Sequence, residues 1–339
     1  MNIKIIGSGS AGNHMAFALQ KYTNKIVLTD VSQKALKRSK EEIYLPRYKK
    51  WNKNIDLVVE GDDQNIYYDA VVIASPPNSH LALIKKNINR SKIFLIEKPI
   101  CEPNKKTINE FEKIISKNKD KIFLCGYNHR LFPSTILLKK ILKKQNDNFN
   151  FMEVKFKENT EGFLKAHSWY KSLSDSYLSS SKNGGGALSE HSHGINLCQY
   201  ILNDDFNFKL ISKDIGFLKN KNSNYDESSN LIFSDKNKVI SIFQNFKTKP
   251  TEKEITISGN NFFVKLIYNH KGSNDRIIYY NKKNKFKKIY DFKKKRSDDF
   301  IYEARYLIKI VKQKTIKESM NILSAKKAIK TMKLINKII

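Results

Sequence analysis

Residues 3–12, with the sequence IKIIGSGSAG, decide how the chain begins to fold. The strand-like run Ile3–Ile6 leads directly into the pattern G-x-G-x-x-G, and a segment with one apolar side, Ala11–Tyr22, follows it. The glycines of the pattern are Gly7, Gly9 and Gly12. Glycine at these positions permits a tight turn, close approach of the backbone to a pyrophosphate, and close packing of helix on strand. The phosphates then meet the positive end of the helix. The stretch predicts a dinucleotide-binding turn, although the pattern alone would also fit a flexible Gly/Ser turn.

Asp30 supports the dinucleotide interpretation. It ends the second strand-like run, 23 residues beyond Gly7, where a carboxylate can accept hydrogen bonds from ribose hydroxyls. A negative charge at this place would repel a 2′-phosphate, so we expect NAD as the cofactor. The cations Lys34, Lys37 and Arg38 follow closely, and they keep NADP as the alternative.

The first 125 residues alternate short apolar runs with helix-like segments. The runs are Ile3–Ile6, Ile26–Leu28, Leu57–Val59, Ala70–Ala74, Ile93–Ile96 and Ile122–Leu124. The clearest helix-like segments are Ala11–Tyr22, His80–Ile88 and Ile108–Lys117. Most runs are continuous rather than alternating, which is typical of strands buried on both faces of a parallel sheet. Residues 1–125 are therefore predicted to form a doubly wound α/β domain.

The pattern changes after about residue 150 to longer strands, several of which alternate in polarity. These are Phe151–Lys157, Val239–Phe246, Ile255–Ile257, Phe262–Tyr268 and Arg276–Tyr280. Polar turns between them predict an antiparallel sheet with one covered face. One closing helix is expected to begin at Ser297 and another near Ser324. Residues 126–339 are thus predicted to form a second, α+β domain.

Composition and charge narrow the classes of partner. Hydrophobic residues make up 40% of the chain and charged residues 28%, which argues against a disordered protein. Lys and Arg total 63 against 33 Asp and Glu, but only 7 of the 63 are Arg, the side chain that reads bases bidentately. The lysines are spread along the whole chain, so we expect no nucleic-acid partner; direct binding of nucleic acid through the lysine surface is a weaker alternative.

The sequence also favours a cytoplasmic protein. No apolar run reaches the roughly 18 residues that a membrane span needs, and no signal-peptide pattern follows Met1. The three cysteines are far apart, so buried reduced thiols are expected at Cys101, Cys125 and Cys198.

Two further segments follow strands at the expected ligand edge of the sheet. The run Ile93–Ile96 is followed by Glu97-Lys98-Pro99, which puts a lysine where open α/β sheets bind ligands, although surface lysines are the commoner case. The fourth run leads into residues 75–80, SPPNSH. His80 is either a ligand contact or only a residue of the following helix.

Together these motifs resemble the glucose–fructose oxidoreductase / inositol dehydrogenase (Gfo/Idh/MocA) family. The residues that carry the resemblance are the glycine turn, Asp30, Glu97-Lys98-Pro99, Gly126-Tyr127-Asn128-His129-Arg130 with Pro133, and Gly184-Gly185-Gly186-Ala187-Leu188. The resemblance extends over essentially the full chain and is closest to the branch linked to surface-polysaccharide and acidic-sugar synthesis.

The resemblance implies an N-terminal Rossmann domain for NAD(P) and a C-terminal domain, with an open and largely antiparallel sheet, for substrate binding and oligomerisation. Family members are oxidoreductases acting mostly on sugars, cyclitols and nucleotide-linked sugars, commonly as homodimers or homotetramers. The cofactor-binding residues expected here are Gly7, Gly9, Ser10, Ala11, Gly12, Asp30, Ser75, Pro76, Asn78, His80, Glu97 and Lys98.

By the same resemblance, Lys98, His193 and Glu190 are the expected catalytic residues. His193 would accept the proton of a sugar hydroxyl while Lys98 polarises its oxygen. The chain departs from the common family pattern, because Glu190 and His193 are three rather than four residues apart and Asn196 stands where Asp is common. Expected substrate contacts are Arg130, Asn128, Trp169 and Tyr170.

Several of these residues have alternative interpretations. His191 and His193 could cap or pack a helix start or, with less support, bind a metal; we expect no metal. Trp169 and Tyr170 could be core residues, and Arg130 could pair with a carboxylate. For the chain as a whole, the motif departures, including His14 after Gly12, leave a non-catalytic dinucleotide-binding sensor as the second hypothesis.

Overall fold

The computed structural model describes residues 1–146, 148–203, 207–272, 274–283, 285–295 and 297–339. The chain forms two compact units, the first comprising Met1–Asn128 and Ser297–Asn336, and the second comprising His129–Arg296 and Lys337–Ile339. The boundary between the first and second units, after Asn128, lies close to the predicted boundary at residue 125. Residues 297–336 differ from the prediction, because they rejoin the first unit instead of staying with the second.

The helix α10 (Asp298–Gln313) explains why residues 297–336 belong to the first unit. The apolar face of this helix buries Phe300, Ala304, Leu307, Ile308 and Val311. The Phe300 ring stacks on His14 of α1 with 4.7 Å between ring centroids. Burial of this face stabilises the first unit, since a helix with an apolar stripe must cover it with another element.

The first unit is built on a six-stranded, fully parallel sheet with strand order β3-β2-β1-β4-β5-β6. Its strands are β1 (Asn2–Ile6), β2 (Lys25–Asp30), β3 (Ile55–Val59), β4 (Ala70–Ile73), β5 (Ile93–Ile96) and β6 (Ile122–Cys125). All six coincide with the predicted apolar runs, and the order is that of a Rossmann fold, so the predicted α/β class is confirmed.

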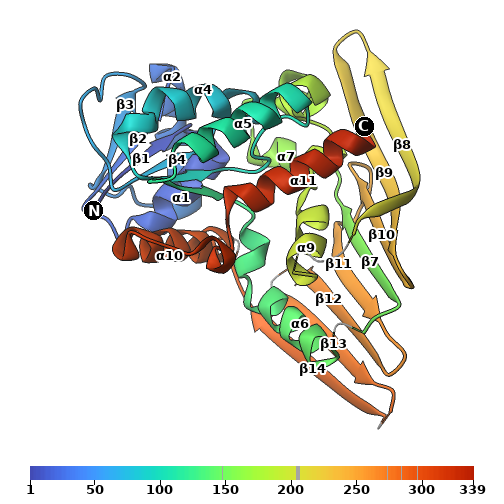
Figure 1. Cartoon of the computed structure of the whole chain (residues 1–339). Helices are drawn as coiled ribbons and strands as arrows, with labels where there is room; N and C mark the ends of the chain where they lie inside the picture. Colours follow the sequence, from blue (N-terminus) through green and yellow to red (C-terminus); the bar gives the residue numbers. More distant parts are fainter. Residues whose placement is uncertain (147, 204–206, 273, 284, 296) are drawn as a thin grey trace. The chain divides into compact units, whose positions relative to one another are not determined.

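Helices cover both faces of this sheet, with α1 and α10 on one side and α4 and α5 on the other (Figure 1). The helices of the unit are α1 (Ser10–Leu19), α2 (Gln33–Arg38), η1 (Ser39–Tyr44), α3 (Leu45–Tyr48), α4 (Pro77–Asn87), η2 (Ile88–Arg90), α5 (Lys105–Lys117), α10, η7 (Glu318–Met320) and most of α11 (Ala325–Ile338). The continuous helical run from α2 to α3 was not predicted.

The second unit holds an eight-stranded sheet of order β14-β13-β12-β11-β7-β10-β9-β8. All neighbouring pairs are antiparallel except β10 and β7, which confirms the predicted, largely antiparallel sheet. The strands are β7 (Phe151–Lys157), β8 (Lys209–Asn220), β9 (Ser223–Asp235), β10 (Lys238–Asn245), β11 (Glu252–Ser258), β12 (Phe262–His270), β13 (Asn274–Asn281) and β14 (Phe286–Lys293). The prediction missed β8, β9 and β14.

Alternating burial along β7 and β12 shows that this sheet has one covered face. Helices α6 and α9 lie along that face (Figure 1). The helical segments of the unit are η3 (Asn128–Leu131), which begins at the unit boundary, α6 (Pro133–Lys144), α7 (Glu161–Ala166), η4 (Leu173–Asp175), η5 (Tyr177–Ser179), η6 (Ser181–Asn183), α8 (Ala187–Glu190) and α9 (His193–Ile201).

Two sequence expectations outside the sheets can be compared with the structure. All three cysteines are buried free thiols, as predicted. Within the ranges that the structure describes, no helix combines the length and the apolar character that a membrane crossing requires.

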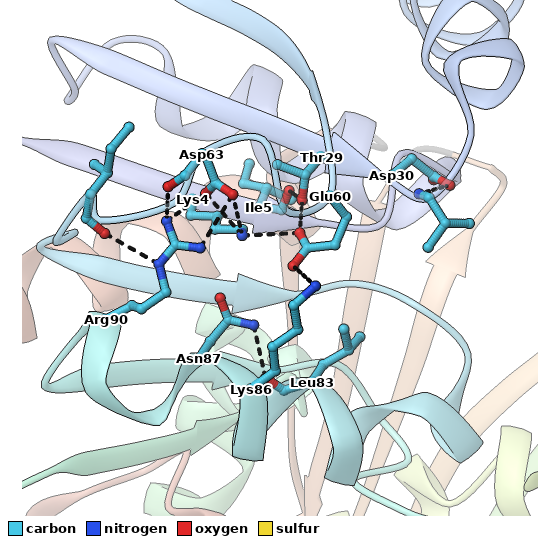
Figure 2. Close-up of polar contacts among 12 residues, drawn as sticks. Lys4, Ile5, Thr29, Asp30, Glu60, Asp63, Leu83, Lys86, Asn87 and Arg90 are labelled. Atoms are coloured by element: carbon cyan, nitrogen blue, oxygen red, sulfur yellow. Dashed lines mark hydrogen bonds and ion pairs between the residues drawn. The ribbon is translucent and has the colours of Figure 1, made fainter.

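A buried ionic cluster lies in the first unit (Figure 2). Lys4, on β1, is fully buried, and its Nζ lies 2.9 Å from a carboxylate oxygen of Glu60 and 2.9 Å from one of Asp63. Arg90 and the Tyr68 hydroxyl also donate to Asp63 at 2.8 Å. Burial raises the pKa of Asp63, but these hydrogen bonds outweigh it and hold the pKa well below its usual range. The cluster fastens the β3–β4 connection to the sheet.

Replacing Lys4 should test this role, because Lys4→Met leaves two buried carboxylates without their shared cation. We expect a loss of about 3–5 kcal/mol in the free energy of unfolding, measured by urea denaturation. The control is Lys25→Met, whose ion pair with Asp56 is about half exposed and should cost at most about 1 kcal/mol. Equal losses in the two variants would contradict a structural role for the cluster.

Candidate functional site

The residues that follow the strands of the first unit are aligned on one edge of the sheet. Their alignment comes from backbone hydrogen bonds that continue the strand pairing by one residue. These bonds are Gly7 N to Thr29 O (2.8 Å), Ala74 N to Ile6 O (2.8 Å), Glu97 N to Ile73 O (2.9 Å) and Gly126 N to Ile96 O (2.8 Å). The edge thus brings together the glycine turn, the segment after β4 and the lysine segment after β5, as the sequence predicted.

The geometry of the glycine turn fits a pyrophosphate. Gly7 has φ +104°, and a Cβ there would lie 2.7 Å from the carbonyl of Ala74. A Cβ at Gly12 would overlap the carbonyl oxygen of Gly7. No side chain caps the start of α1, at Gly9, so the N–H groups of its first turn, which includes Ser10 and Ala11, suit an anionic group.

Asp30 lies at the tip of β2 beside this turn. One of its oxygens accepts hydrogen bonds from the Ser8 backbone N (2.9 Å) and hydroxyl (2.7 Å), and the other accepts from Val31 N (2.9 Å). These bonds hold the carboxylate where an adenosine ribose lies in Rossmann domains.

The segment after β4 contains one residue with a different role from the expected one. Pro76 and Asn78 are exposed, and the Ser75 hydroxyl is 2.6 Å from that of Ser79. His80, in contrast, is fully buried, with Nε2 2.8 Å from the carbonyl of Ser75 and Nδ1 3.1 Å from that of Ile100. Burial lowers the pKa of His80. His80 therefore braces the segment after β4 against the lysine segment, and the structure does not support a direct ligand contact.

Lys98 follows β5 at the same edge and is partly exposed. Its backbone N lies 3.2 Å from Glu97 Oε2, so the Glu97 carboxylate turns back toward the lysine segment. A Cβ on Gly126 would lie 3.1 Å from that oxygen and 2.9 Å from Oε1 of Glu303 on α10. Two carboxyl groups thus converge over Gly126, which explains why a residue without a side chain follows β6.

Glu303 is the unusual member of this pair. It is fully buried, and among the residues that the structure describes neither carboxyl oxygen has a hydrogen-bond partner. Burial raises its pKa well above the usual value, and the charges of Glu97 and Asp299 raise it further. The surroundings of Glu303 therefore favour its protonated form.

In the second unit, the triple-glycine block leads into α8 and α9, which carry the other predicted catalytic residues. Three side chains from other elements hold this segment. Asp226 on β9 accepts from Leu188 N (2.6 Å), and Gln244 on β10 donates to the carbonyl of His191. Arg130 donates through Nε to Asn196 Oδ1 at 2.5 Å and through Nη2 to the Asn196 carbonyl at 3.1 Å.

Arg130 differs from its predicted role. Its side chain is 2% exposed and joins η3 to α9, so it positions that helix rather than forming a wall of a substrate pocket. Asn196 accepts the hydrogen bonds of Arg130 through its side-chain oxygen and its carbonyl, so this residue has a structural role in holding α9. Asn128, which ends the first segment of the first unit, is partly exposed at the start of η3.

His193 and Glu190 lie at the two ends of the short connection between α8 and α9. The His193 ring packs on the ring of His129, with 4.3 Å between centroids, and on Phe156. Glu190 is partly exposed and accepts a hydrogen bond from the Tyr177 hydroxyl at 3.1 Å. His193 is buried and Glu190 is partly exposed, and their roles as proton acceptor and acidic neighbour stay predictions.

Trp169 and Tyr170 belong to a group of packed aromatic rings with Phe163 and His167. Centroid distances are 4.1 Å for Phe163–His167, 5.0 Å for His167–Trp169 and 5.6 Å for Trp169–Tyr170. Phe163 also packs against the apolar cluster that contains Ala187 of α8. Both predicted residues are partly exposed, which fits a substrate-facing surface better than a core position.

The sequence prediction missed Glu303, Asp226 and Gln244. Glu303 and Asp226 carry no recognisable local motif; only an acidic residue on an otherwise buried face could have indicated them. Among the residues that the structure describes, no group of three or more His, Cys, Asp or Glu side chains is arranged to hold a metal ion.

The raised pKa of Glu303 has a consequence for the stability of the fold. Its folded-state pKa lies above the unfolded value of about 4.3, so the folded chain binds the proton more tightly and loses stability as pH rises above that value. Between the two pKa values, each pH unit should cost about 1.4 kcal/mol. Glu303→Gln removes this cost. We expect the melting temperature of this variant to exceed that of the wild type at pH 8, by a margin that shrinks toward pH 5. The exposed control Glu41→Gln should show the same dependence of melting temperature on pH as the wild type. The same dependence in Glu303→Gln would contradict a raised pKa of Glu303.

Comparisons with known proteins agree with this geometry. The profile of the Gfo/Idh/MocA family, described as an oxidoreductase family with an NAD-binding Rossmann fold, matches residues 1–128. No curated protein sequence matches the chain significantly.

Solved structures with the same fold cover nearly the whole chain. A levoglucosan dehydrogenase in complex with NADH has a TM-score of 0.73 at 14% identity, covering 99% of this chain and 95% of its own. UDP-N-acetylglucosamine 3-dehydrogenase GnnA from Acidithiobacillus ferrooxidans has a TM-score of 0.69 at 10% identity, covering 100% and 96%. The transcriptional regulator Gal80p from Kluyveromyces lactis has a TM-score of 0.73 at 16% identity, covering 99% and 90%.

At these identities the solved structures establish a shared fold, which enzymes and a regulator both use. The sequence match of the first unit goes further, since it covers the glycine turn, Asp30 and Glu97-Lys98-Pro99 together. Residues 1–128, which make up most of the first unit, therefore carry the sequence pattern of the Gfo/Idh/MocA family of oxidoreductases.

Proposed function

We propose that the protein is an NAD(P)-dependent dehydrogenase that transfers a hydride between nicotinamide and a hydroxyl-bearing carbon of a sugar or nucleotide-linked sugar. The observation that carries the proposal is the placement of Lys98 on the same sheet edge as the glycine turn, one strand beyond the segment after β4. An amine at this place can reach both a nicotinamide and the oxygen that reacts.

The residues divide the chemistry between them. A bound nicotinamide would supply the hydride acceptor. Lys98 would donate a hydrogen bond to the substrate oxygen and stabilise negative charge on it, and His193 would accept the hydroxyl proton. Glu190, with its hydrogen bond from Tyr177, would orient the substrate or the histidine. Trp169 and Tyr170 would offer flat apolar surface to a sugar ring.

The cofactor site favours NAD over NADP. The Asp30 carboxylate lies where it can accept from the ribose hydroxyls and would repel a 2′-phosphate. Two enzymes of the same fold, the levoglucosan dehydrogenase and the UDP-N-acetylglucosamine 3-dehydrogenase, support sugars and nucleotide-linked sugars as the substrate class. We propose a role in polysaccharide or acidic-sugar biosynthesis within the cytoplasm. The net charge of +30 also suits an anionic, nucleotide-linked substrate.

The half-exposed face of the eight-stranded sheet would suit pairing of two copies. Along β7 and β12 every second residue is only partly buried on this side. We therefore propose a homodimer or homotetramer as the working form.

Lys98→Met tests the function directly. Purified wild type is first screened with sugars, acidic sugars and UDP-linked sugars by NADH absorbance. On the substrate found, we expect the variant to bind NADH normally but to lose turnover by about 10²–10⁴-fold, because the charged donor is gone. Lys92→Met, an exposed lysine just before β5, is the matched control. Wild-type turnover in Lys98→Met would refute the catalytic assignment, and tight NADH binding by the wild type without turnover of any sugar would favour the sensor.

His193→Ala should separate proton acceptance from binding. We expect turnover to fall by about 10²–10⁴-fold at pH 7 and to recover partly at high pH, where solvent base replaces the imidazole. NADH affinity should be unchanged, since His193 lies in the second unit and the glycine turn in the first. A pH-independent defect, or an equal defect in the control His270→Gln, would contradict the role.

A further inference from the structure

Asp226 is a fully buried carboxylate that contacts the start of the segment carrying Glu190 and His193. It lies on β9, and its Oδ2 accepts a hydrogen bond from Leu188 N at 2.6 Å. Its other oxygen, Oδ1, has no hydrogen-bond partner in the part of the chain that the structure describes. A buried carboxylate held by backbone N–H groups alone, with no cation, is costly unless it has a specific task.

The triple-glycine block is shaped around this carboxylate. Gly186 has φ +91°, and a Cβ there would overlap Asp226 Oδ1. A Cβ on Gly185 would overlap the carbonyl oxygen of Tyr177. The glycines therefore make room for close contacts in a packed structure, and the block is not a flexible loop.

The contact sets the beginning of α8. Directly after the Leu188 bond, the helical bonds run from Glu190 N to Gly186 O (2.9 Å) and from His191 N to Ala187 O (2.8 Å). His193 starts α9 two residues later. A shift at residue 188 would thus move both predicted catalytic side chains, because the connection between them is so short.

The charge of Asp226 can change near neutral pH. Burial raises its pKa to about 7, although hydrogen bonds from Leu188 and Ala187 N–H groups oppose the shift. The ionisable groups near it on the elements packed against β9 are Glu190 and His191 on the segment it contacts, Tyr177 on η5, Lys182 on η6 and Lys219 on β8. Tyr225 and Glu227 flank it on its own strand. An N–H bond to a carboxylate is roughly twice as strong as one to a neutral acid, so protonation would weaken the hold on α8.

We propose that Asp226 is a positioning residue whose negative charge fixes the Ala187–His193 segment in the arrangement that lets His193 accept the substrate proton. The proposal rests on the proposed dehydrogenase function for its role in the reaction. The contact itself can be tested without any substrate.

The first measurement is amide hydrogen exchange of the intact wild-type protein between pH 5.5 and 8.5, corrected for intrinsic exchange. We expect protection of the Leu188 and Glu190 amides to fall by about tenfold or more as pH drops through the ionisation of Asp226. In Asp226→Asn protection should be low and independent of pH. Equal protection of Leu188 at both ends of the range in the wild type would overturn the proposal, even if the variant failed to fold.

The second measurement is the pH dependence of kcat/KM. At low pH we expect kcat/KM of the wild type to fall with the protonation of two groups, the His193 imidazole and the Asp226 carboxylate. In Asp226→Asn it should fall with the protonation of His193 alone. At pH 8 the variant should lose about tenfold or more in kcat with unchanged NADH affinity. Gly186→Ala, whose methyl group displaces the carboxylate, should behave like Asp226→Asn, and Gly162→Ala, where a Cβ meets no atom closer than 3.7 Å, should behave like the wild type.

The two measurements separate the possible failures. If no sugar is turned over, the proposed function fails, and hydrogen exchange still decides whether Asp226 holds the segment. If turnover occurs and kcat/KM falls at low pH in the same way in the wild type and in Asp226→Asn, the proposed function stands and the role of Asp226 is refuted.

Discussion

Continuation of the backbone ladder beyond the ends of the parallel strands is the constraint on which the cofactor side of this protein depends. The residue after each of four strands donates its N–H to a neighbouring strand end, so the glycine turn, the segment after β4, the lysine segment and Gly126 are held in one row. Side chains add to this alignment, since Ser8 donates to Asp30 and His80 lies within hydrogen-bond distance of the carbonyls of Ser75 and Ile100. The main-chain bonds set the places of the glycine turn and of the lysine segment along the edge.

Buried polar groups hold the connections on either side of that row. Lys4 and its two carboxylates fasten the chain after β3, and His80 links the segments after β4 and β5 through two backbone carbonyls. Glu303, on a helix late in the chain, brings a buried carboxyl group with a raised pKa close to Glu97. In the second unit, Asp226, Gln244 and Arg130 hold the segment of His193 in the same manner. Each site is therefore supported by side chains that are distant in sequence and buried.

The solved structures show that one fold serves both dehydrogenases and a transcriptional regulator. A fold alone does not decide between such uses. We propose that Lys98 and His193 are the groups that decide between these uses in this chain. Asn196, which differs from the common family pattern, is engaged by Arg130 inside the protein and so does not by itself indicate a loss of chemistry.

The sequence by itself determined the parallel sheet, the glycine turn, the end of β2 at Asp30 and the place of Lys98, because continuous apolar runs and glycine requirements are local signals. It did not indicate β8, whose largely exposed residues resemble a loop until they pair with β9, and it did not indicate the mixed polar and apolar β9. The buried Lys4 appeared to be one surface lysine among many, and Arg130 appeared to be a substrate contact. Only the tertiary structure decided that these charges are interior, that residues 297–336 rejoin the first unit, and that Asp226 contacts the triple-glycine block. The physical reason is that burial and pairing of a charge depend on residues far away in the sequence, which no local pattern records.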